Sequence, residues 1–257
     1  MKTQALIVIF FLSIGLSKSA VASSDIVRIC HGSGGYPPYH FYPEQVTKGS
    51  MQGATIDILK LLFEQLKLDY EVKPVPWKRC YETALDARSF DIIADGSYNL
   101  QRADLFYYSI PLYKLTPSIF IANRVGLSLP IKSAQQISGL KLCANRGTNL
   151  KGYGLNQSNI SLITFSIKNG LEMVKRSRCE GFLSLKEIVA GHYLIDKGKG
   201  LPQGLKAVPL SYAKLWTMHL MISRNAKNAE HLILRINQAI MRLQYRGEFD
   251  KILQRYQ

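Results

Sequence analysis

Negatively charged side chains are scarce in this 257-residue sequence, which has 18 acidic and 33 basic residues and a formal net charge of +15. The basic residues form no run of five or more, and no nucleic-acid-binding motif occurs, so we expect no nucleic-acid partner. The excess of basic over acidic residues favours anionic or zwitterionic ligands and acidic partner surfaces. A generically basic surface is the alternative interpretation.

Long apolar segments are missing except near the N-terminus. There, Ala5 to Leu16 form an apolar run of about 12 residues, short for a membrane-spanning helix of roughly 20. The run follows Lys2 and precedes Ala20-Val21-Ala22, the small-x-small pattern of signal-peptide cleavage. We therefore expect residues 1–22 to be a cleaved signal peptide and the chain from Ser23 to be periplasmic. An uncleaved membrane anchor is the alternative.

Motifs of several enzyme classes are also absent from the sequence. It has no G-x-S-x-G nucleophile elbow, no phosphate-binding glycine loop, and no cysteine or histidine spacing typical of a metal site. We therefore expect no catalytic residue, no metal and no other cofactor. Hydrolase and nucleotide chemistry have no support.

The residues after the N-terminal segment predict two α/β units. Strand-like apolar segments alternate with segments whose apolar residues recur every 3.6 positions. The first unit has the order β-α-β-α-β, which is typical of a mostly parallel sheet flanked by helices. We predict linkers near residues 113–117 and 207–215. The predicted strands are 26–30, 70–75, 90–94, 118–122, 140–144, 161–165, 181–184 and 215–222, and the predicted helices are 53–66, 77–85, 169–177, 185–195, 232–243 and 249–256.

The four cysteines are expected to form disulfides, because export places them in an oxidising compartment. Four cysteines allow three connectivities. Pairing Cys30 with Cys80 and Cys143 with Cys179 keeps each disulfide within one unit, so we favour that arrangement. Free buried cysteines are the alternative.

The most informative segment runs from Phe90 to Tyr113, FDIIADGSYNLQRADLFYYSIPLY. A predicted strand, Phe90–Ala94, is followed by a small-polar loop with Ser97 and Asn99, and then by Arg102. A guanidinium beside hydroxyl and amide groups can bind a carboxylate through two parallel charge-assisted hydrogen bonds. An exposed loop arginine on an ordinary α/β domain is the alternative.

This segment resembles the core of the bacterial extracellular solute-binding proteins of family 3, where a strand, a Ser/Thr-rich turn, an arginine and an FS-x-P-Y segment follow one another. Further matches in the family's order are Tyr36-Pro37-Pro38-Tyr39, Gly147-Thr148 and Ile236-Asn237-Gln238-Ala239-Ile240. The first helix start, Gly53-Ala54-Thr55-Ile56-Asp57-Ile58, matches only in part. Together these motifs cover essentially the whole exported chain.

The resemblance implies an α/β clamp of two lobes joined by two hinge crossovers, the type 2 periplasmic-binding-protein fold. We expect lobe 1 to comprise residues 23–114 and 214–257, and lobe 2 residues 115–213. Such a clamp, as a monomer, would close on a small anionic or zwitterionic solute and deliver it to an inner-membrane ABC permease. The alternatives are a sensor for a membrane signalling partner and, less favoured, a dehydratase-type enzyme.

The loops that follow the strand ends supply the candidate site residues. Arg102 would bind a ligand carboxylate, Ser97 and Asn99 would add hydrogen bonds, and Asp95 would pair with a ligand amine or an arginine. The remaining candidates, from an aromatic wall and from anion-binding loops of both lobes, are Tyr36, Tyr39, Trp77, Arg79, Arg146 and Thr148.

One position departs from the family's amino-acid binders. Their acidic residue that neutralises the ligand's α-ammonium aligns with Leu185, and Glu187 lies two residues further on. This departure favours a carboxylate or another anion over a standard amino acid. Asp95 and Glu187 are the only general-acid candidates for the enzyme alternative.

Overall fold

The computed structural model describes residues 26–42, 51–146, 148, 150–155, 160–163, 166–195 and 201–256. The predicted signal peptide lies outside these residues. Within them, no helix combines the length and apolar character needed to cross a membrane.

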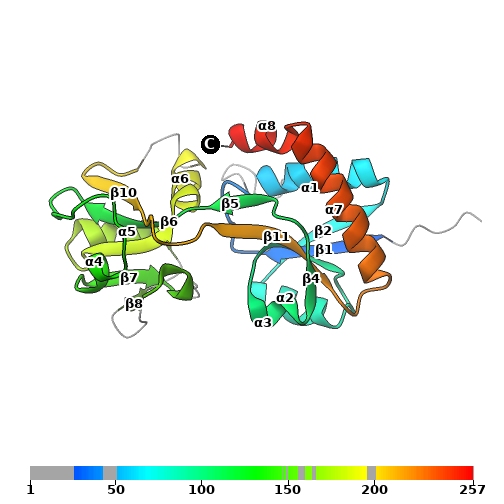
Figure 1. The fold of residues 1–257 in the computed structure, drawn as a ribbon, viewed down its shortest axis with the longest axis horizontal. Helices are drawn as coiled ribbons and strands as arrows, with labels where there is room; N and C mark the ends of the chain where they lie inside the picture. The colour runs from blue at the N-terminus through cyan, green and yellow to red at the C-terminus, as the bar shows by residue number, and fades with distance from the viewer. Residues whose placement is uncertain are drawn as a thin grey trace, which may run out of the picture.

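The described residues form two units, each a sheet flanked by helices (Figure 1). We call the unit with the six-stranded sheet lobe 1 and the unit with the five-stranded sheet lobe 2. The strand order in lobe 1 is β2-β1-β3-β11-β4, with β5 also paired to β11, and in lobe 2 it is β10-β6-β9-β7-β8.

The elements of lobe 1 come from both ends of the chain. Its strands are β1 (Val27–Gly32), β2 (Tyr70–Val75), β3 (Ile92–Ser97), β4 (Phe106–Tyr108), β5 (Tyr113–Leu115) and β11 (Trp216–Ser223). Its helices are α1 (Ala54–Leu66), α2 (Trp77–Leu85), α3 (Leu100–Ala103), α7 (Ala229–Tyr245) and α8 (Glu248–Gln254).

Lobe 2 is built from the middle of the chain. Its strands are β6 (Pro117–Ala122), β7 (Leu142–Asn145), β8 (Ile160–Ile163), β9 (Gly181–Leu185) and β10 (Leu205–Pro209). Its helices are α4 (Gln135–Ser138), the 3-10 helix Leu150–Tyr153, α5 (Ile167–Lys175) and α6 (Lys186–Ile195).

The predicted α/β clamp is confirmed, but its sheets are mixed rather than mostly parallel. Strands β2, β1 and β3 are parallel, whereas β11 is antiparallel to β3, β4 and β5. The reason is that β11 re-enters lobe 1 beside the carboxyl end of β3, where Met218 pairs with Ser97. In lobe 2, β6 is likewise antiparallel to β9 and β10.

Two predicted boundaries are wrong. The predicted loop at Gly96 and Ser97 belongs to β3, where a side chain at position 96 would collide with Met221 of β11. The predicted linker 207–215 begins within β10, which pairs with β6. The other crossover is short, because only Thr116 separates β5 from β6.

Apolar periodicity explains how the helices pack. Helix α1 buries Ile58, Leu59, Leu62, Phe63 and Leu66, all on one face. Helices α1, α7 and α8 pack together over one side of the lobe 1 sheet, as Figure 1 shows. The main core cluster continues into lobe 2 through Phe120 and Phe182.

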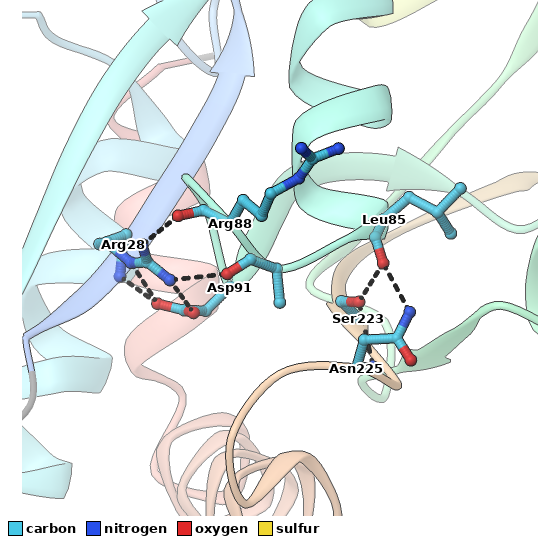
Figure 2. Close-up of polar contacts among 7 residues, drawn as sticks. Arg28, Leu85, Arg88, Asp91, Ser223 and Asn225 are labelled. Carbon is cyan, nitrogen blue, oxygen red and sulfur yellow. Dashed lines mark hydrogen bonds and ion pairs between the residues drawn. The ribbon is translucent and has the colours of Figure 1, made fainter.

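An ion pair joins the amino ends of β1 and β3, away from the strand ends that carry the candidate site residues (Figure 2). The Arg28 guanidinium donates to both carboxylate oxygens of Asp91, at 2.7 and 3.1 Å. It also donates to the carbonyl oxygens of Arg88 and Ala87, at 2.7 and 3.0 Å. These contacts hold the turn between α2 and β3 against the amino end of β1.

Strand β11 is tied to the end of α2 at the same side of the sheet (Figure 2). The Ser223 hydroxyl and the Asn225 side-chain amide both donate to the carbonyl oxygen of Leu85, at 2.9 Å each. The carbonyl at the end of α2 thereby obtains two partners outside its own helix.

Both disulfides favoured from the sequence are present. Cys30–Cys80 connects β1 with α2, and Cys143–Cys179 connects β7 with the turn before β9. Each disulfide therefore lies within one lobe.

Candidate ligand-binding cleft

A cavity of about 630 Å³ lies between the two lobes. It is lined at the carboxyl ends of β1, β3, β7 and β9, the side of an α/β sheet where ligands bind. The size is typical of a site for a small molecule. The two lobes therefore enclose a cleft of the kind that the sequence predicts.

The structure brings most of the predicted ligand-binding residues to this cavity. Those that line it are Tyr36, Trp77, Asp95, Ser97, Asn99, Arg102, Arg146 and Thr148. Tyr39 and Arg79 are not among the lining residues. Tyr39 is buried and stacks on Tyr113 with ring centroids 3.8 Å apart, and Arg79 is exposed on α2.

Arg102 is held in place at the carboxyl end of β3. Asn99 caps α3 by accepting the Arg102 backbone N–H at 3.2 Å. The guanidinium lies 5.6 Å from the ring centroids of both Trp77 and Tyr81, a cation–π distance. No acid of the described residues forms an ion pair with it. Within the described residues, the guanidinium is thus positioned without an acidic partner.

Asp95 is buried at the end of the same strand and has three donors. Its Oδ1 accepts from Thr55 Oγ1 at 2.7 Å and from the Tyr113 hydroxyl at 2.6 Å, and its Oδ2 lies 2.7 Å from His40 Nδ1. Burial alone would raise the pKa of Asp95, but the hydrogen bond and charge of His40, with the two hydroxyls, lower it. The structure thus pairs Asp95 with His40 and not with Arg79 or Arg102.

His40, the partner of Asp95, was not predicted from the sequence. Its Nε2 lies 3.2 Å from the carbonyl oxygen of Gly32, so both ring nitrogens face an oxygen acceptor. His31 lies beside it, with ring centroids 4.4 Å apart. Burial, together with the nearby His40, lowers the pKa of His31 to about 4. His31 is therefore neutral near pH 7.

Lobe 2 contributes two buried polar atoms that lack a partner within the described residues. They are the Tyr153 hydroxyl and Asn145 Oδ1, and both residues line the cavity. The Tyr153 ring packs edge-on against Trp216 at 5.6 Å, and burial raises the pKa of its hydroxyl, which stays protonated. The Thr148 backbone N–H, predicted to bind an anion, donates to the Asn145 carbonyl at 3.1 Å. Gly147 lies outside the described residues.

Leu185 lines the cavity, and Glu187 does not. The Glu187 carboxylate accepts the backbone N–H and the hydroxyl of Thr116, at 2.8 and 2.7 Å. Thr116 is the residue that joins β5 to β6. Glu187 therefore connects the start of α6 to a crossover between the lobes. No group of side chains suited to a metal ion occurs in the described part of the chain.

A two-lobed α/β fold with a cleft between the lobes defines a clamp-type binding protein. Residues 29–257 match the family model of the bacterial extracellular solute-binding proteins, family 3, and the chain belongs to that family. It is 24% identical, over 173 residues, to a probable amino-acid ABC transporter-binding protein of Haemophilus influenzae. That match covers 65% of this chain and 63% of the relative, less than two thirds of the relative's length.

Solved structures share the fold at low sequence identity. A histidine kinase sensor domain similar to periplasmic binding proteins superposes with a TM-score of 0.68 at 14% identity, covering 90% of this chain and 96% of the other. The arginine-, lysine-, histidine-binding protein ArtJ of Geobacillus stearothermophilus gives 0.67 at 13% identity, covering 90% and 94%. These structures support the type 2 clamp fold.

Proposed function

We propose that this protein captures a small carboxylate-bearing or amino-acid-like solute between its lobes and delivers it to an inner-membrane ABC permease. The observation that carries the proposal is Arg102, a positioned guanidinium in the cavity between the lobes that has no acidic partner among the described residues. A carboxylate would satisfy its parallel donors. Ser97 and Asn99 line the cavity beside it.

The proposal includes the predicted organisation of the chain. Residues 1–22 are removed as a signal peptide, and the rest works in the periplasm as a monomer. Lobe 1 comprises residues 23–114 and 214–257, and lobe 2 residues 115–213. The two crossovers act as the hinge about which the lobes close on the solute.

Calorimetry on the wild type and on Arg102→Ala tests the carboxylate site. The solute would first be identified by mass spectrometry of small molecules released from the denatured, purified protein. We expect Arg102→Ala to weaken its binding by about 2 kcal/mol or more, because a charge-assisted pair in a desolvated site is lost. Arg246→Ala, an exposed arginine just after α7, is the matched control. Unchanged affinity in Arg102→Ala would contradict the proposal.

Delivery to a permease is supported by the name of the H. influenzae relative, and the sensor alternative by the histidine kinase domain of the same fold. An uptake assay separates them. Membrane vesicles from the source cells should accumulate labelled solute only when the loaded protein is added. No accumulation, together with ligand-dependent kinase activity in the same membranes, would favour the sensor.

Neither acidic candidate for the dehydratase alternative lies in the described residues as a free carboxyl group facing the cavity. Asp95 is held as a carboxylate by His40, and Glu187 is bound to Thr116. Within the described residues, no other aspartate or glutamate lines the cavity.

A further inference from the structure

We propose that the cleft selects a small solute with two anionic groups and no ammonium group. One anionic group would contact Arg102 of lobe 1 and the other Arg146 of lobe 2. This inference rests on the proposed function, because it assumes that the cavity is the solute site. It narrows the ligand from carboxylate-bearing or amino-acid-like solutes to dianions.

The described residues that line the cavity offer no free carboxylate to an ammonium. Asp95 is the acidic residue among the described residues that line it. Its side chain is 4% exposed and already accepts hydrogen bonds from three protein groups. An ammonium that approached Asp95 would compete with these donors for a carboxylate whose hydrogen bonds already lie inside lobe 1.

Glu187, two residues beyond Leu185, is the other acidic candidate. Leu185 presents an apolar side chain to the cavity. Both oxygens of the Glu187 carboxylate are used by Thr116. An ammonium placed beside Leu185 would lose its hydration without gaining a counter-charge, which is strongly unfavourable.

The cavity has a surplus of positively charged side chains. Arg102 and Arg146 line one cavity from opposite lobes, and neither forms an ion pair within the described residues. A guanidinium remains charged at every physiological pH and can hold a carboxylate or a phosphate with two parallel hydrogen bonds. A ligand with two negative groups can neutralise both positive charges at once, one on each lobe.

Lobe 2, which carries Arg146, also contributes neutral hydrogen-bonding groups to the cavity. Thr148 lines the cavity with a side-chain hydroxyl, and the buried Tyr153 hydroxyl is protonated and lacks a partner among the described residues. Both can donate to an anionic group. Asn145 Oδ1, a buried acceptor, can accept from a ligand hydroxyl but carries no charge to neutralise an ammonium.

The test is a binding panel, measured by calorimetry on the full exported chain after bound solutes are removed by unfolding and refolding. The dianions are the linear dicarboxylates from succinate to pimelate, with phosphoglycolate as the phosphate-bearing arm. L-glutamate is the matched partner of glutarate, because the two differ by an α-ammonium. Butyrate supplies one carboxylate, and L-arginine represents the cationic ligands named for ArtJ.

We expect a dianion without ammonium to bind most tightly, and glutarate to bind about 10-fold or more tighter than L-glutamate because the ammonium stays unpaired. Arg102→Gln and Arg146→Gln should each weaken the best dianion at least about 30-fold. Arg178→Gln, an exposed arginine of lobe 2 outside the cavity, is the control and should leave the affinity unchanged.

Two results would overturn the inference while leaving solute capture intact. One is that L-glutamate or L-arginine binds more tightly than every dianion. The other is that Arg146→Gln binds the best dianion as well as the wild type does. If no member of the panel binds and the denatured protein releases no solute, the proposed function fails as well. The two failures are therefore distinguishable.

Discussion

At the scale of single residues, Asp95 and His40 decide which charges the cleft offers to a ligand. They are 55 positions apart in sequence, and their side chains lie 2.7 Å apart. Thr55 and Tyr113 also donate to Asp95, so both oxygens of its carboxylate have partners inside lobe 1. Asp95 thereby stabilises the wall of the cavity, and its predicted contact with a ligand stays a prediction.

His31, the neighbour of His40, predicts a loss of stability in mild acid. Its pKa in the folded chain is about 4, below the value of about 6.5 expected when unfolded. Between these values the unfolded chain binds more protons, so the stability is complete above pH 6.5 and falls as the pH drops toward 4. The slope is at most about 1.4 kcal/mol per pH unit. Between pH 7 and pH 5 the His31 contribution to the free energy of unfolding should fall by about 2 kcal/mol, and His192 and His219, whose pKa values burial also lowers, add to the total loss measured by urea unfolding.

Two variants separate His31 from the other titrating groups. His31→Gln removes the ionisable ring, so its free energy of unfolding should change less between pH 7 and pH 5 than that of the wild type. His231→Gln, an exposed histidine on α7, should keep the wild-type difference. A His31→Gln protein with the full wild-type loss would contradict the assignment.

At the scale of elements, the apolar pattern predicted most of the fold. The longer helices and the buried strands carry enough residues for their period to be visible, as the buried face of α1 shows. Strands β4 and β5, of three residues each, are too short for that. The sequence of β10, LKAVP, shows no clear alternation of polar and apolar residues. Its pairing with β6 could therefore not be predicted from the sequence.

The candidate site residues were predictable where they lie together at the end of one strand and in the segment that follows it. Ser97, Asn99 and Arg102 lie within one short segment, so the sequence indicates them together. The partnership of Asp95 with Thr55 and His40 joins three segments that only folding brings together. Tyr153 was not predicted, because an aromatic residue at the end of a single 3-10 turn does not show from the sequence which cavity it faces.

The ion pair between Arg28 and Asp91, at the amino ends of β1 and β3, leads to a prediction about stability. We expect Arg28→Ala to lower the free energy of unfolding by about 2–3 kcal/mol, because it removes charge-assisted hydrogen bonds and leaves the part-buried Asp91 carboxylate without its guanidinium. Chemical denaturation at neutral pH measures the change. Binding should persist, since these residues lie at the end of the sheet away from the cavity.

Arg88 provides a matched control in the same turn (Figure 2). Its backbone carbonyl accepts from Arg28, while its side chain pairs with Asp86 at the surface. Arg88→Ala removes only that exposed pair, so the expected loss is below about 1 kcal/mol. If the two variants lose the same free energy of unfolding, the ion pair between Arg28 and Asp91 contributes no more stability than the exposed pair of Arg88.

At the scale of the whole molecule, the lobes are linked in two different ways. The crossovers at Thr116 and at residues 210–215 are covalent, and Glu187 reinforces the first by binding Thr116. The lobes also touch beside the cleft, where Gly191 of α6 lies against Pro37 and Pro38. The second contact depends on glycine, since a Cβ at position 191 would overlap the backbone and ring atoms of that loop.

Gly191→Ala therefore tests whether this contact belongs to the closed, ligand-bound form. Alanine favours a helix more than glycine does, so α6 should remain intact while its new methyl group holds the lobes apart. Small-angle scattering should show a smaller ligand-induced decrease in the radius of gyration than in the wild type, with weaker solute binding. Gly139→Ala, at the end of α4 with open space around it, should behave like the wild type. A Gly191→Ala protein that contracts and binds normally would mean that the lobes close without this contact.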